Sequence, residues 1–122
     1  NIWVICMDYL PPFLDLTQAR EIAGDELLLR ELVQTFLDSL DTEMTHVQAA
    51  FQAQDEKRVH DSLHALKGFL ALFCQPPLAQ AMVDLYQGCR QHGLAQTEPA
   101  YRRLEPAFLE LQKETKAWLG AL

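Results

Sequence analysis

Residues 55–73 read DEKRVHDSLHALKGFLALF, and the spacing of the apolar side chains in this stretch decides the fold class. The apolar residues recur at steps of three and four, which is typical of one face of a helix. Asp55 is expected to cap this helix at its start. The helix should stop before Pro76, because a proline disfavours helical backbone in the residue that precedes it. The apolar face consists of Val59, Leu63, Leu66, Leu70 and Phe73.

The segment before this helix predicts another, longer one. Asp25 is a good N-cap, and the helix is expected to run from about Glu26 to about Ala53. Gly24 is expected to close a short preceding helix that begins near Thr17, because glycine readily adopts the left-handed conformation. The apolar face of the long helix consists of Leu29, Val33, Phe36, Leu40, Met44, Val47 and Phe51.

The segment after residues 55–73 predicts two more helices. Residues 76–77 are both proline and suit a first helical turn, where a missing N–H costs little. Gly93 is expected to close that helix, and the last helix is expected to begin near Thr97 and Pro99. Pro106 lies inside the last apolar stripe and is expected to kink the helix or split it. The two stripes are Leu78, Met82, Leu85 and Cys89, then Tyr101, Leu104, Phe108, Leu111, Thr115, Trp118 and Leu122.

The length of 122 residues suits one domain. Long amphipathic helices joined by short loops predict an all-α fold, an antiparallel four-helix bundle with a short extra N-terminal helix, over residues 14–122. Residues 1–13 are expected to be a linker or N-terminal extension of a segment taken from a longer chain. Residues 1–7 are apolar but too short to span a bilayer, and they lack the basic region of a signal peptide. They are expected to be a linker remnant or a flap over the core.

Charge and cysteine content narrow the classes of partner and compartment. The formal net charge of −7 disfavours nucleic acid and anionic membrane surfaces as partners and suits a protein with a basic rim. The three cysteines are odd in number and form no CxxC pair, which argues against a disulfide framework or a structural zinc site. A reducing compartment, the cytoplasm, fits this usage best.

The solvent face of the helix over residues 55–73 carries the candidate site. Since each helical residue turns about 100°, Lys67 lies about 60° from His64 on one side and Gly68 about 40° on the other. Most histidines in such a place are ordinary surface residues, but these two neighbours are unusual. Lys67 can meet an anion carried by the imidazole. Gly68 costs about 1 kcal/mol against alanine in a helix interior, yet it removes bulk so that another backbone can come close.

The stretch His64-Ala65-Leu66-Lys67-Gly68 resembles the HxLKG signature of histidine phosphotransfer (HPt) domains, the carrier modules of bacterial multistep phosphorelays. The similarity extends over about Leu14 to Leu119. It includes Leu14-Asp15-Leu16, Ala23-Gly24-Asp25 and Leu28-Leu29-Arg30-Glu31-Leu32, which are similar to the opening helices of the family. The resemblance implies a module of a larger protein, expected to be the C-terminal module of a hybrid sensor histidine kinase.

The resemblance also implies what the site residues do. His64 would attack the phosphoaspartate of a receiver domain through Nε2 and later pass the phosphoryl group to a second receiver aspartate. Lys67 would stabilise the charge, and Gly68 would give the partner clearance. The partners would be receiver domains, with oligomeric state left open. The Mg²⁺ that the reaction needs would belong to the receiver, so this chain would need no cofactor or metal, and without an ATP site it would be a carrier and not an enzyme.

The residues that come directly after the signature depart from the family pattern. The family favours small residues where Phe69 and Leu70 stand, and both are predicted to point into the bundle as packing variants. The family usually has a glycine where Cys74 stands. A cysteine is strained in left-handed geometry, so the turn there is expected to differ.

Three alternatives to a receiver-to-receiver carrier remain open. The chain could be a helical scaffold that binds a receiver or kinase domain without being phosphorylated, or the phosphoacceptor domain of a chemotaxis-type kinase. His60 and His64 lie four residues apart and could together ligate a metal, although Lys67 beside them opposes a cation. The cytoplasmic chain would be either free or tethered to the inner membrane through a parent sensor kinase.

Overall fold

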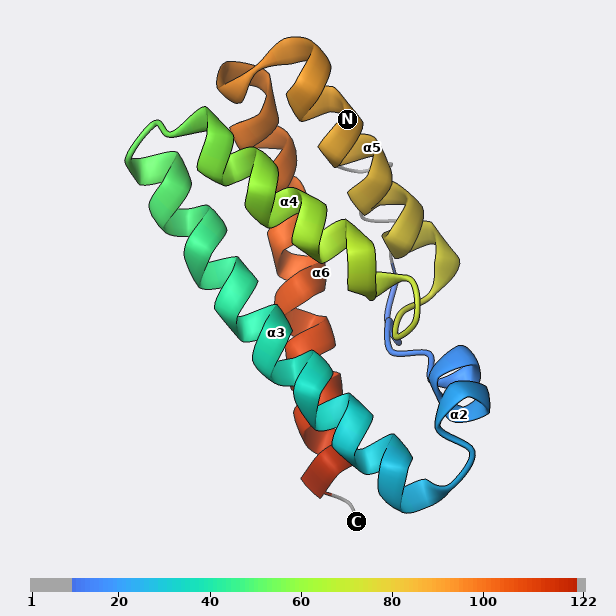
Figure 1. Ribbon diagram of the computed structural model, residues 1–122. Helices are drawn as coiled ribbons and strands as arrows, with labels where there is room; N and C mark the ends of the chain where they lie inside the picture. The colour runs from blue at the N-terminus through green and yellow to red at the C-terminus, as the bar shows by residue number, and fades with distance from the viewer. Residues whose placement is uncertain (1–9, 121–122) are drawn as a thin grey trace.

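A computed structural model describes residues 10–120, which form a bundle of helices (Figure 1). Helix α3 packs against α4 and α6, α4 packs against α5, and α5 packs against α6, so these four helices enclose one core. The short helix α2 lies beside α3. The predicted all-α bundle with a short extra helix is confirmed. The helices are α2 (Thr17–Ala23), α3 (Glu26–Gln52), α4 (Glu56–Leu70), α5 (Pro76–His92) and α6 (Leu94–Gly120).

The helix starts follow the predicted capping residues. The Asp25 carboxylate accepts a hydrogen bond of 2.8 Å from the Leu28 amide, and the Asp55 carboxylate accepts one of 3.1 Å from the Arg58 amide. Each satisfies an amide of a first turn that has no partner inside the helix. Gly24 ends α2 in the left-handed region, with φ of 81°, as predicted.

The predicted start of the last helix is wrong by one turn. Helix α6 begins at Leu94, directly after Gly93, and the Thr97 amide and hydroxyl both donate to the Gly93 carbonyl. Pro99 therefore lies in the second turn and not at the start. Helix α6 also continues through Pro106, so the predicted alternative of a split helix is wrong. None of the helices within residues 10–120 is long and apolar enough to cross a membrane.

The predicted apolar faces make the core. Leu63, Leu66 and Leu70 of α4 are fully buried. Helix α4 ends at Leu70, earlier than its stripe suggested, and Phe73 lies buried in the turn that follows. The Phe36 ring of α3 stacks on the Phe73 ring with centroids 4.3 Å apart, and this contact attaches the turn to the bundle.

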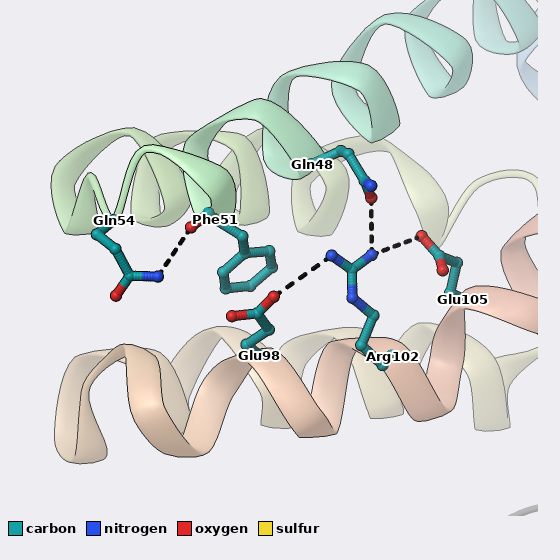
Figure 2. Close-up of polar contacts among 6 residues, drawn as sticks. All are labelled: Gln48, Phe51, Gln54, Glu98, Arg102 and Glu105. Atoms are coloured by element: carbon teal, nitrogen blue, oxygen red, sulfur yellow. Dashed lines mark hydrogen bonds and ion pairs between the residues drawn. The ribbon is translucent and has the colours of Figure 1, made fainter.

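Helices α3 and α6 are cross-linked near the end of α3 (Figure 2). The Arg102 guanidinium donates to the Gln48 side-chain oxygen at 2.7 Å, and it pairs with Glu105 at 3.2 Å and Glu98 at 3.4 Å. These polar contacts lie on the outside of the bundle and leave the core apolar. Nearby, the Gln54 side chain donates to the Phe51 carbonyl and closes the last turn of α3.

The chain ahead of α2 is tied to the bundle by a clasp made of residues 13–15, Glu114 and residues 73–75. The Phe13 and Leu14 amides donate to the Glu114 carboxylate at 2.8 and 2.7 Å. On the other side, Leu14 forms an isolated antiparallel bridge with Cys74. Two backbone hydrogen bonds flank the bridge. The Asp15 amide donates to the Phe73 carbonyl at 2.9 Å, and the Gln75 amide donates to the Phe13 carbonyl at 2.8 Å. Residues 1–7, expected to be a linker remnant or flap, lie outside the described residues.

The bridge explains how Cys74 replaces the glycine of the family pattern. Within residues 10–120, Gln54 is the non-glycine residue with positive φ, so Cys74 escapes the left-handed geometry that would strain it. The turn therefore differs, as predicted. Cys74 is buried, with 4% of its surface exposed, and its backbone pairs with Leu14 in the isolated bridge.

The stability of the fold, measured as its free energy of unfolding, is expected to fall above about pH 9 because of Cys74. Burial, helped by the nearby Asp15 carboxylate, raises the pKa of the Cys74 thiol from 9.0 to about 12. A raised pKa means that the stabilisation is complete below the unfolded pKa and is lost as the pH rises toward the folded pKa. The free energy of unfolding should therefore fall by up to about 1.4 kcal/mol per pH unit in this window from this thiol.

Urea unfolding of wild type and Cys74→Ala at several pH values from about 8 to 11 measures this effect. Cys89 and Tyr101, whose burial also raises the pKa of their side chains, are present in both proteins, so the difference between the curves isolates Cys74. The variant is expected to be less stable at pH 8 and to lose less stability above pH 9. Parallel curves would show that the thiol is not held protonated by the fold.

Candidate functional site

His64 lies near the middle of α4 with its side chain exposed, while Leu63 and Leu66 beside it are fully buried. This is the arrangement predicted from the stripe, because the helix turns one face to the core and the opposite face to solvent. The placement of His64 on the surface is confirmed. Its role as phosphoacceptor stays a prediction.

The ring of Tyr86, from α5, lies beside His64. The centroids of the two rings are 5.4 Å apart, and the His60 ring, one turn earlier on α4, is 4.8 Å from the same Tyr86 ring. The Lys67 ammonium stands over that ring at 5.1 Å from its centroid. Side chains from three successive turns of α4 therefore meet one aromatic side chain of the neighbouring helix.

Gly68 is exposed, and its surroundings are open. A Cβ atom built at Gly68 would have no heavy atom within 4 Å outside the helix's own nearby backbone. The bundle therefore does not need a glycine here for packing. The expected cost of a helical glycine remains, because no close contact at this position requires one.

His64 lies on an exposed face of α4 and lines neither of two hollows in the surface of the bundle. A hollow of about 480 Å³ lies between α5 and α6, and its lining includes Gly88 and Arg103 but not His64. A smaller groove of about 330 Å³ between α3 and α4 is lined by Glu43, His46, Arg58, Asp61 and Ser62. An imidazole on a convex helix face cannot enclose a small substrate. Such a site suits a reactive group that a protein partner brings to it.

The metal interpretation of His60 and His64 finds no support in the described part of the chain. Residues 10–120 contain no group of three or more potential ligands that could hold a metal ion together.

The departures after the signature are packing variants, as predicted. Leu70 is fully buried. Phe69 is half-buried, and its ring meets the Phe36 ring edge-on with centroids 5.8 Å apart. Phe69 supports the contact between α4 and α3, and Leu70 lies in the core, so neither side chain obstructs the exposed His64 face.

Tyr86 is the member of the site that sequence reasoning missed. The stripe of α5 was assigned to Leu78, Met82, Leu85 and Cys89. Tyr86 lies one position after Leu85 and one turn after Met82, at the edge of that stripe. An aromatic residue at the edge of a buried face was the available signal. Its meaning depends on which neighbouring helix lies on that side, which the spacing alone does not give.

Comparison with known proteins agrees with this geometry. The chain matches the family model of the Hpt domain over residues 31–118, which includes all of α4 and α5. Searches of curated proteins and of solved structures gave no match to the chain. The family match spans well over half of the sequence and includes His64, Lys67 and Gly68. The chain therefore belongs to the Hpt domain family, the phosphocarrier modules of two-component phosphorelays, whose partners are receiver domains.

Proposed function

We propose that His64 accepts a phosphoryl group from the aspartate of one receiver domain and passes it to the aspartate of another. The observation that carries the proposal is the exposed imidazole with open space beside it at Gly68. A receiver can bring its phosphoaspartate to this face without moving any part of the bundle. Family membership supports the reaction class.

The transfer would use a neutral imidazole that carries its proton on Nδ1 and presents the lone pair of Nε2. The Nε2–phosphorus bond forms as the bond from phosphorus to the aspartate oxygen breaks, and the receiver keeps a free carboxylate. The second transfer reverses these changes on another receiver. The Mg²⁺ that balances charge would sit in the receiver, and Lys67 would add a positive charge from this side.

Label transfer tests the proposal directly. A receiver domain labelled with radioactive phosphate on its aspartate is mixed with the chain, and the chain is then isolated. We expect the label to move to the chain and to be stable in alkali but labile in acid, as for a phosphoimidazole. Binding of receivers without transfer of label from any of them would favour the scaffold alternative.

The cellular setting is part of the same proposal. The chain would act in the cytoplasm, as a module of a sensor histidine kinase that holds it near one of its receivers. Direct phosphorylation by an ATP-binding kinase domain, without a donor receiver, is the outcome that would instead place it among chemotaxis-type phosphoacceptor domains.

A further inference from the structure

The Tyr86 ring is the point where the side chains of the His64 face meet α5. It lies 4.8 Å from the His60 ring, 5.4 Å from the His64 ring and 5.1 Å from the Lys67 ammonium. Tyr86 itself is half-buried and packs against the core, so its position is set by the contact between α4 and α5. A ring held in this way offers a fixed surface to side chains that are otherwise exposed.

The contact with Lys67 is the one with a chemical consequence. An ammonium within about 6 Å of an aromatic centroid is attracted by the negative face of the ring. Across residues 10–120, Lys67 has no carboxylate within ion-pair distance, whereas Lys57 on the same helix pairs with Asp61 at 3.1 Å. The charge of Lys67 is therefore held in place without being neutralised.

We propose that Tyr86 is a positioning residue, which holds the Lys67 ammonium in place beside His64 before a partner arrives. This inference rests on the proposed function of His64. A lysine side chain has many rotamers, and fixing it during the reaction would oppose the transfer. A charge that is already in place when the phosphoryl group arrives costs no rearrangement. Tyr86 thus acts through Lys67 and is not itself a catalytic residue.

A packing role for Tyr86 makes different predictions from a positioning role. If the side chain only fills space between α4 and α5, an aliphatic residue of similar size should serve equally well. If the aromatic face holds Lys67, then Tyr86→Phe should behave as wild type, while Tyr86→Leu should lose the effect even when it folds. The loss should also disappear when Lys67 is absent.

The first measurement is by NMR and does not depend on phosphorylation. The ε-methylene protons of Lys67 are expected to be shifted upfield by the ring current in wild type and in Tyr86→Phe, and to return toward ordinary lysine values in Tyr86→Leu. Lys57, which forms no cation–π contact within the described residues, serves as the internal reference. Equal Lys67 shifts in wild type and Tyr86→Leu would overturn the proposal.

The second measurement is the rate of label transfer from a phosphorylated receiver. Tyr86→Leu is expected to slow it by about twofold to fivefold, the range that corresponds to an exposed cation–π contact, while Tyr86→Phe stays within error of wild type. In a Lys67→Met background, Tyr86→Leu should give no further loss. An equal loss with and without Lys67, or no loss at all, would overturn the proposal.

Thermal unfolding accompanies both measurements. If Tyr86→Leu does not fold, Tyr86→Met supplies an aliphatic side chain that adapts to irregular space. Unfolding of both would assign the ring to packing and overturn the positioning role. If wild type accepts no label from any receiver, the proposed function of His64 fails, and the NMR shifts still report whether Tyr86 holds Lys67.

Discussion

Replacing His64 with glutamine is expected to abolish phosphoryl transfer to the chain while leaving its fold intact. The glutamine amide nitrogen has no free lone pair to attack phosphorus, whereas the imidazole does. The side chain at this position is exposed, and glutamine is a good helix former, so the free energy of unfolding should change by no more than about 0.5 kcal/mol. Label transfer from a phosphorylated receiver and thermal unfolding, measured on the same preparation, check both parts.

His60→Gln is the matched control for this variant. His60 lies one turn earlier on the same face, contacts the same Tyr86 ring and is about one-third exposed. It should retain most of the transfer if His64 alone carries the phosphoryl group. If the label persisted on His64→Gln and disappeared from His60→Gln, the phosphoacceptor would be His60, and the assignment to His64 would be wrong.

Replacing Gly68 with glutamine is expected to reduce transfer by roughly tenfold or more while stabilising the isolated domain by up to about 1 kcal/mol. The gain arises because glycine is a poor helix former and the position has open space for a side chain. The loss arises because the new side chain would stand where a receiver must approach His64. Function and stability should therefore move in opposite directions, which a glycine needed for packing would not allow.

Gly88→Gln separates the two effects. Gly88 is also helical, and a Cβ there also meets nothing within 4 Å, but it lines the hollow between α5 and α6 and not the His64 face. It should show the gain in stability with normal transfer. Normal transfer by Gly68→Gln would refute the clearance argument, and unfolding of that variant would refute its surface placement.

Much of the fold follows from local chemistry that is visible in the sequence. The apolar stripe of α4 predicts that Leu63 faces the core. His64 does not belong to that stripe and lies on the opposite face of the helix, so it is predicted to face solvent. Asp25 and Asp55 mark helix starts because their carboxylates satisfy free amides of the first turn. These relations involve residues a few positions apart, so they do not depend on how the helices are arranged.

The features that the sequence did not reveal depend on contacts between distant segments. Pro99 suggested a helix start because proline is common there, but Gly93 alone suffices to separate α5 from α6, and the first turn forms ahead of the proline. The place of Tyr86 beside Lys67 requires the rotation of α5 relative to α4. Spacing along one helix carries no information about that rotation.

The clasp between residues 13–15 and the bundle has a consequence for the order in which the protein folds. Its bonds to Glu114 join segments that are 100 and 101 positions apart in the sequence. The complete clasp needs α6 and the turn after α4 to be already side by side, because its backbone bonds run to that turn. Contacts between segments so distant in sequence close late, since the chain must first lose the freedom of a long loop. Pairs of helices that follow one another along the chain can dock earlier. Residues 13–15 are therefore among the last parts of the described chain to be secured during folding. Their amides can exchange with solvent while the four-helix core is still closed.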